Sequence, residues 1–286
     1  MGAKPGKSNG RQSVLIKIPP QPVKPLKVRM PRYPVWTRNK AVVIARYLRY
    51  FQFITHHGTY VDAFAAPQSD KQLDTWAARL VLELEPLWLR HFHLFDLPGR
   101  CRFLEALQAR HPKRDIQVHP GDFNEQLADL LDSGAITEKE ATFCLLDQRS
   151  FECQWSSLRA LAGHKKTGNK IELFYFLANS WLGRAVSAQK DKSIIDKWWG
   201  GPGWREWRKL GRIERMQFFT ERLRKELRYR HAHAWAIYER ADGGRVMYYM
   251  VHATDHDEAP RLMTRAYERA VGPIETEQQL RLDLGI

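Results

Sequence analysis

Short apolar segments alternate with helix-forming segments along most of this 286-residue chain, and this alternation constrains the fold more than any other feature. The apolar segments have the length of buried strands and occupy residues 58–66, 90–97, 115–119, 141–147 and 171–178. Between them lie segments of helical character, at residues 75–84, 99–110, 124–132 and 154–161. Nearly continuous apolar strands separated by helices are typical of a parallel sheet covered on both faces. The sequence therefore predicts a Rossmann-like, doubly wound α/β fold.

Two further segments extend this core. Apolar residues recur with helical spacing over residues 38–56, and Thr37 is a suitable N-cap for that helix. After the fifth strand, residues 180–230 carry many charged and aromatic side chains without a strand pattern, which indicates a helical basic insert.

The last part of the chain predicts a β-hairpin. Residues 234–240 and 245–253 have strand character and flank the turn sequence Asp242-Gly243-Gly244. A final helix is expected at residues 258–270. With the hairpin, the expected sheet has seven strands and is mainly parallel.

The beginning of the chain is strongly basic. Its first forty residues contain no Asp or Glu, and several prolines prevent a continuous helix there. We expect residues 1–36 to be a flexible, Pro-rich basic arm with one short strand at 13–18, residues 37–272 to form the α/β domain, and residues 273–286 to be a tail. The whole chain has a net charge of +14, which favours a polyanionic partner, with nucleic acid the commonest. A solvated tail without a partner explains the arm equally well.

Several function classes are excluded by composition. No apolar run approaches the roughly 18 residues of a membrane span, and no secretory leader is recognisable. The three cysteines are too few for a disulfide framework or a paired-cysteine metal site, so we expect buried thiols in a cytoplasmic protein. His91 and His93 share a strand face but lack a third ligand at a recognised spacing, so no metal site is predicted.

Four predicted strands carry an acidic residue at or near the carboxyl end. The first strand contains Asp62, the second and fourth end in Asp96 and Asp147, and the third runs into Gly121-Asp122. Ligands of open α/β sheets bind outside the carboxyl ends of the strands. Carboxylates at that edge can accept hydrogen bonds from ribose hydroxyls or an adenine amine. Each acid taken alone is better explained as a helix N-cap. Together, however, the four favour a nucleoside-containing cofactor.

The strand end Tyr60-Val61-Asp62-Ala63-Phe64-Ala65, preceded by a lysine-containing amphipathic helix, resembles the three-Cys-motif partner proteins. These bacterial and phage proteins are similar to class I S-adenosylmethionine-dependent methyltransferases. The resemblance extends from about Arg38 to Val271 and includes the fourth-strand Asp, the Tyr-rich last strand and Thr254-x-His256. It implies a methyltransferase-like sheet. It also implies a partner protein with three cysteines that resembles radical-S-adenosylmethionine proteins.

The resemblance further assigns roles to individual residues. The loop after the first strand, with Asp62, Phe64 and Ala66, is expected to surround the methionine end of S-adenosylmethionine. Asp96 is expected to hold the ribose and Asp122 the adenine. The resemblance places Asp147 and Phe151 on the acceptor side of the site, where the group that receives the methyl would bind, as the candidate catalytic residues.

Two loops depart from the family pattern. Ala66-Pro67-Gln68 stands where a Gly-Pro-Gly loop is usual, and Asp147-Gln148-Arg149-Ser150-Phe151 replaces an Asp-Pro-aromatic sequence. Arg149 would place a cation beside the sulfonium, which is unfavourable. In amino-methylating enzymes, carbonyl groups of this loop accept hydrogen bonds from the target amine and an aromatic ring stacks on its base. Gln148 still offers a side-chain carbonyl for the first role, and Phe151 offers a ring for the second. Two hypotheses therefore stand: a methyltransferase-like protein associated with nucleic acid, or a catalytically degenerate nucleic-acid-binding or assembly subunit on the same scaffold.

The basic insert offers a nucleic-acid surface of its own. Four tryptophans at 198, 199, 204 and 207 lie close to the candidate nucleic-acid-binding residues, which are Arg205, Arg208, Lys209, Arg212 and Arg215. Aromatic side chains among arginines are typical of surfaces that stack unpaired bases and contact phosphates. The alternative is that the tryptophans form the core of the insert. The following helix, predicted over 213–230, has one apolar face and one basic face.

Overall fold

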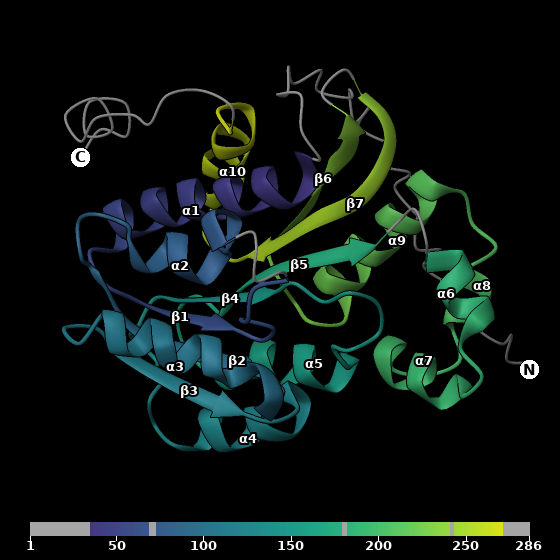
Figure 1. Cartoon of the computed structure of the whole chain (residues 1–286). Helices are drawn as coiled ribbons and strands as arrows, with labels where there is room; N and C mark the ends of the chain where they lie inside the picture. Colours follow the sequence, from purple (N-terminus) through teal and green to yellow (C-terminus); the bar gives the residue numbers. More distant parts are fainter. Residues whose placement is uncertain (1–34, 69–72, 179–181, 241–242, 271–286) are drawn as a thin grey trace, which may run out of the picture.

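The computed structural model describes residues 35–68, 73–178, 182–240 and 243–270. Seven strands form one sheet in the order β3-β2-β1-β4-β5-β7-β6 (Figure 1). The first five strands run parallel, and β7 pairs antiparallel with both β5 and β6. The strands are β1 (Gly58–Asp62), β2 (Leu89–Asp96), β3 (Asp115–Pro120), β4 (Thr142–Leu146), β5 (Glu172–Ala178), β6 (His231–Arg240) and β7 (Gly243–Thr254). The predicted mainly parallel α/β sheet is therefore confirmed.

Helices cover both faces of the sheet because its central strands are apolar on both sides. On one face lie α1 (Val35–Thr55), α2 (Ala77–Leu82), α3 (Cys101–Arg110) and α10 (Ala259–Glu268). On the other lie α4 (Phe123–Asp132), α5 (Trp155–His164) and the helices of the insert. Figure 1 shows α1, α2 and α10 on one side of the strands and α4 and α5 on the other.

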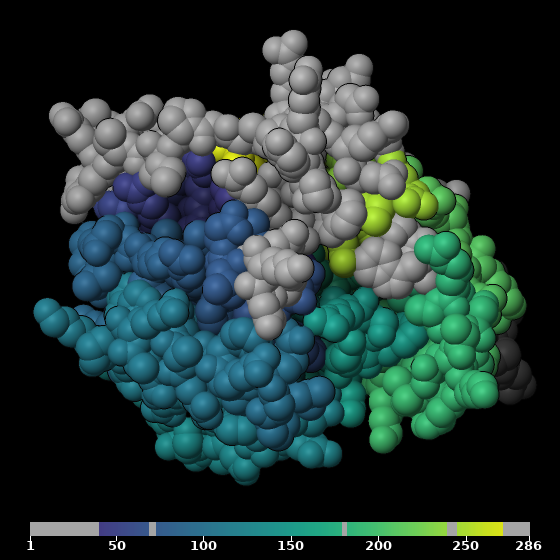
Figure 2. Space-filling view, in the orientation of Figure 1, coloured from purple at the N-terminus to yellow at the C-terminus, as the bar shows by residue number. Residues whose placement is uncertain are grey.

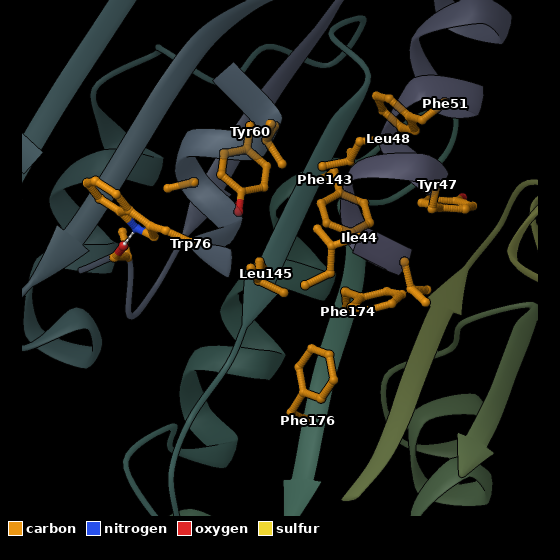
Figure 3. Close-up of a cluster of buried hydrophobic side chains, with 14 of the residues drawn as sticks. Ile44, Tyr47, Leu48, Phe51, Tyr60, Trp76, Phe143, Leu145, Phe174 and Phe176 are labelled. Carbon is orange, nitrogen blue, oxygen red and sulfur yellow. Dashed lines mark hydrogen bonds between the residues drawn. The ribbon is translucent and has the colours of Figure 1, made fainter. Parts of the chain in front are cut away.

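The core of the first face is largely aromatic. Tyr47 of α1 lies over Phe143 of β4, with ring centroids 5.8 Å apart, and Phe143 lies 5.6 Å from Phe174 of β5. Figure 3 shows these rings together with Ile44 and Tyr60 in one continuous cluster. This packing fixes α1 against the centre of the sheet.

The insert between β5 and β6 consists of α6 (Leu182–Ala188), α7 (Lys192–Trp199), α8 (Trp204–Trp207) and α9 (Arg212–Lys225). It forms one side of the molecule, coloured green in Figure 2. Its four tryptophans are 2–4% exposed and belong to the core. Of the two interpretations of these tryptophans, the one that places them in the core of the insert is therefore confirmed, because their rings pack against one another and against the sheet.

Gly200 ends α7 in a left-handed conformation (φ 80°). A Cβ atom at this position would lie only 2.6 Å from the indole of Trp155. Glycine is therefore required both by the backbone conformation and by the close approach of α5.

Most predicted boundaries lie within a few residues of the observed ones. The strand expected at 58–66 ends at Asp62, and the helix expected over 213–230 begins at Arg212 and ends at Lys225. Helix α1 begins at Val35, so Thr37 lies inside it and is not its N-cap. The strand predicted at 13–18, the turn at Asp242 and most of the predicted arm lie outside the described residues, as does the predicted C-terminal tail. None of the described helices is both long and apolar enough to cross a membrane.

Candidate cofactor-binding site

The four strand-end acids line a single cavity. Its volume is about 310 Å³, and Asp62, Asp96, Asp122 and Asp147 all contribute to its wall. The cause is the register of the sheet: β1 pairs in parallel with both β2 and β4, and Asp96 at the end of β2 aligns with Pro120 at the end of β3. Parallel strands end at the same edge, so residues that follow them converge there.

Asp96 ties the loop after β1 to the end of β2. Its Oδ2 accepts a hydrogen bond from the backbone N–H of Ala66 (2.9 Å), and its Oδ1 accepts one from the N–H of Leu97 (2.8 Å). Arg100 lies 3.5 Å from the same carboxylate and also donates to the carbonyl of Pro67. The Ala66-Pro67 sequence therefore forms a fixed loop, and Phe64 and Ala66 both line the cavity.

Asp62 is the most buried of the four acids, with an exposed fraction of 2%. The hydroxyl of Tyr60 donates to its Oδ2 (2.8 Å), and the backbone N–H of Phe64 donates to its Oδ1 (3.2 Å). Burial raises the pKa of Asp62 to about 7, because a desolvated carboxylate loses its hydration. The two hydrogen bonds oppose this rise in pKa, and the negative charges of Asp147 and Asp96 add to it. Asp62 is therefore an acid that changes charge near neutral pH.

Asp122 has both of the roles considered for it. It is the N-cap of α4, since its Oδ1 accepts a hydrogen bond from the N–H of Asn124 (2.7 Å). It also lines the cavity beside Gly121, whose φ of 148° favours glycine. A helix cap and a ligand contact are compatible, because one carboxylate has about four acceptor positions.

Asp147 forms an ion pair that sequence reasoning missed. Lys40 of α1 is 3% exposed, and its Nζ lies 2.6 Å from Oδ1 of Asp147. The ammonium also lies 4.6 Å from the ring centre of Phe176 and 5.3 Å from that of Tyr248, at the wall of the cavity. The available signal was spacing: Lys40 stands four residues before Ile44, on the apolar face of the predicted helix.

The other residues of the fourth-strand loop divide between cavity and core. Arg149 lines the cavity. Phe151 is not among the lining residues; its ring packs edge-on against Trp198, with centroids 5.1 Å apart. Gln148 is 2% exposed, and its side-chain carbonyl accepts the N–H of Cys153 (3.0 Å), while its amide group donates to the hydroxyl of Tyr175. The side-chain carbonyl that the sequence assigned to substrate contact is thus already bonded within the protein.

The cavity wall has an excess of acidic groups. Five carboxyl side chains line it, those of the four strand-end acids and Glu152, against the three cations of Lys40, Arg100 and Arg149. This balance suits a ligand that carries positive charge. Carboxylate acceptors beside the aromatic rings of Phe64 and Phe123 also suit a nucleoside. The residues present therefore fit S-adenosylmethionine, which combines a nucleoside with a sulfonium cation.

The five basic residues of the insert lie on α8, on α9 and in the segment between them, and none of them lines the cavity. Arg205 pairs with Asp196 (3.4 Å), and Lys209 pairs with Glu206 (2.7 Å). Arg208 donates to the hydroxyl of Ser187 (3.2 Å). The sequence thus grouped residues whose electrostatic surroundings differ.

Within the described part of the chain, no group of three or more His, Cys, Asp or Glu side chains is arranged to hold a metal ion. Comparison with known proteins adds no assignment: no protein-family model matches this chain, and no curated protein matches it either.

Proposed function

We propose that this protein binds S-adenosylmethionine in the cavity at the carboxyl edge of the sheet and is a methyltransferase-like protein that acts on nucleic acid. The observation that carries the proposal is the convergence of four strand-end acids on one cavity of about 310 Å³. Five parallel strands followed by an antiparallel pair also agree with the sheet that the resemblance to class I methyltransferases implies.

The chain's own residues would divide the work of binding. Asp96 and Asp122 have acceptor capacity for ribose hydroxyls and the adenine amine, beyond the backbone and side-chain donors that they already hold. Asp62 lines the cavity at the end of β1, and Phe64 provides an apolar surface in the loop that follows. Bound S-adenosylmethionine would supply an electrophilic methyl group, and the protein would mainly have to orient the acceptor and exclude water.

The acceptor side supports a second candidate function, that of a binding or assembly subunit without turnover. Lys40 neutralises Asp147, Gln148 is bonded to Cys153 and Phe151 is packed against Trp198. Within the loop of residues 148–152, only Arg149 and Glu152 line the cavity. This candidate predicts cofactor binding or nucleic-acid binding without methyl incorporation.

Calorimetric titration with S-adenosylmethionine tests the cofactor site. We expect binding by the wild type and a loss of about tenfold or more in affinity for Asp96→Asn, because hydrogen bonds to charged acceptors are worth about 1.5–3 kcal/mol. Asp115→Asn is the matched control: it removes an exposed carboxylate from the opposite end of β3, where Asp115 contacts His91 (2.6 Å). Absence of heat at millimolar cofactor, or equal losses in both variants, would refute the assignment.

Transfer of a radiolabelled methyl group separates the two candidates. The wild type, incubated with labelled S-adenosylmethionine and single-stranded or double-stranded nucleic acid, should incorporate label if the protein is a methyltransferase. Cofactor binding without incorporation into any of these substrates would favour the non-catalytic subunit.

A further inference from the structure

Three arginines of the insert have no acidic partner among the residues that the structure describes. Within the described residues, no carboxylate forms an ion pair with Arg208, Arg212 or Arg215, although Arg205 and Lys209 beside them are both paired. Glu214, the acid next to Arg215 in the sequence, does not pair with these arginines. Its Oε2 instead accepts a hydrogen bond from the backbone N–H of Gly211 (2.7 Å) at the start of α9. Uncompensated cations gathered at a surface create a local positive potential that attracts anions.

The three arginines also form one cluster. Arg215 donates to the backbone carbonyl of Arg208 and lies over the ring of Trp207, at 5.6 Å from its centre. The pKa of Arg215 is lowered, first by burial and then by the positive charges of Arg208 and Arg212. Its Nε is buried and has no hydrogen-bond partner in the described part of the chain. An anion bound beside these three cations would offset their mutual repulsion, so anion binding is favourable here.

An exposed aromatic ring lies one helical turn from the cluster. Phe218 follows Arg215 by three residues in α9, so their side chains are neighbours on the helix surface. It is 46% exposed, and its ring is nearly parallel to that of Trp199, at 6.0 Å and 20°. Trp199 in turn packs against Trp207 (4.8 Å). A buried indole therefore holds the exposed ring in a fixed orientation.

We propose that Arg208, Arg212 and Arg215 bind the phosphates of single-stranded nucleic acid and that Phe218 stacks on one of its unpaired bases. Phosphates satisfy clustered guanidinium groups, and an exposed ring reaches a base only where that base is not inside a duplex. The inference rests on the nucleic-acid part of the proposed function and assigns it a site. It does not depend on the cofactor cavity, whose lining residues are all different.

The charge test uses two double variants of equal net charge. Arg208→Gln/Arg212→Gln removes two unpaired arginines, and Arg205→Gln/Lys209→Gln removes two paired cations. Fluorescence anisotropy of a labelled 20-nucleotide single strand, measured over a range of salt concentrations, gives both the affinity and its salt dependence. We expect the first variant to bind about tenfold more weakly, with a salt slope shallower by about 1.4, and the control to stay within about twofold of the wild type. Equal losses in both variants, or none in either, would overturn the assignment.

The stacking test compares two exposed apolar residues of α9. Phe218→Ala should weaken single-strand binding by about fivefold or more without changing the salt slope, because a ring contributes stacking and no charge. Ile213, which is 64% exposed, provides the control Ile213→Ala, and this should leave binding unchanged. An equal affinity for the matching duplex would overturn the choice of single strands.

Cofactor titration of the same variants keeps this proposal separate from the proposed function. We expect Arg208→Gln/Arg212→Gln to bind S-adenosylmethionine as the wild type does. Failure of the wild type to bind any nucleic acid would refute the phosphate site while leaving the cofactor proposal standing, and failure to bind cofactor would do the reverse.

Discussion

At the scale of a single residue, Asp62 affects both the candidate site, because it lines the cavity, and the stability of the fold, because its carboxyl group is buried. In the unfolded chain its carboxyl group titrates near its ordinary pKa of about 4, whereas burial raises the pKa to about 7 in the folded protein. Between these two pH values the folded state holds a proton that the unfolded state has released. The free energy of unfolding must therefore fall as pH rises through this window and level off above about pH 7.

Asp62→Asn tests this effect. The amide cannot ionise, so the stability of the variant relative to the wild type should increase by about 2.5 kcal/mol between pH 5 and pH 8, as measured by urea denaturation at both pH values. Comparing the two proteins at each pH cancels the contribution of other titrating groups. Asp129→Asn, at an exposed position of α4, is the control and should show no such change. A stability difference for Asp62→Asn that does not vary with pH would contradict the prediction.

Sequence reasoning located the acids of the site better than it located the surroundings of the aromatic residue. The convergence of Asp62 and Asp96 was predictable, because residues that follow parallel strands share one edge. Phe151 was assigned to the acceptor side from the resemblance of its loop to an Asp-Pro-aromatic sequence, but its ring packs on Trp198, 47 residues further along the chain. Packing between distant segments leaves no local pattern, so the sequence could not show which way that ring turns.

At the scale of elements, the ion pair between Lys40 and Asp147 joins α1 to the end of β4. Removing one partner of a buried pair leaves the other charge uncompensated and costs about 3–5 kcal/mol. Lys40→Met should therefore destabilise the protein by about 3 kcal/mol in urea denaturation. Lys40→Met/Asp147→Asn should recover most of this loss, since no charge then remains unpaired.

An exposed pair of the same type provides the comparison. Arg79 of α2 and Glu83, the C-cap of that helix, lie 2.7 Å apart with side chains about two-fifths exposed, so Arg79→Met should cost less than about 1 kcal/mol. If the double variant were no more stable than Lys40→Met, the loss would come from missing packing at Lys40 and not from the charge of Asp147.

Elements were more predictable than their contacts. Periodicity is local, so the alternation of strands and helices could be read from short windows of sequence. The order in which β4 lies beside β1, and β7 beside β5, depends on pairing between segments far apart in the chain. In the same way, Lys40 and Asp147 are 107 residues apart, and only the folded sheet brings them together.

At the scale of the whole molecule, two segments far apart in the sequence carry a concentration of positive charge. Residues 1–34 contain eight Lys and Arg residues and no acid, and the insert carries the Arg208–Arg212–Arg215 cluster in α9 and the segment before it. A segment rich in positive charge strengthens binding to any polyanion, because neutralised phosphates release counterions. We expect the Arg208–Arg212–Arg215 cluster beside the exposed ring of Phe218 to add a preference for single strands over duplexes.

Neutralising the basic segment separates these two contributions. In the full chain, replacement of Lys4, Lys7, Arg11, Lys17, Lys24, Lys27, Arg29 and Arg32 by Gln lowers the net charge from +14 to +6, because eight positive residues are removed. We expect weaker binding and a shallower salt slope for single strands and duplexes alike, with the preference for single strands and the cofactor titration unchanged. Anisotropy titrations at several salt concentrations measure both quantities. A variant with the same 34 residues in scrambled order keeps the charge and should bind like the wild type; if it binds as weakly as the neutral variant, the segment acts through its sequence and not through its charge.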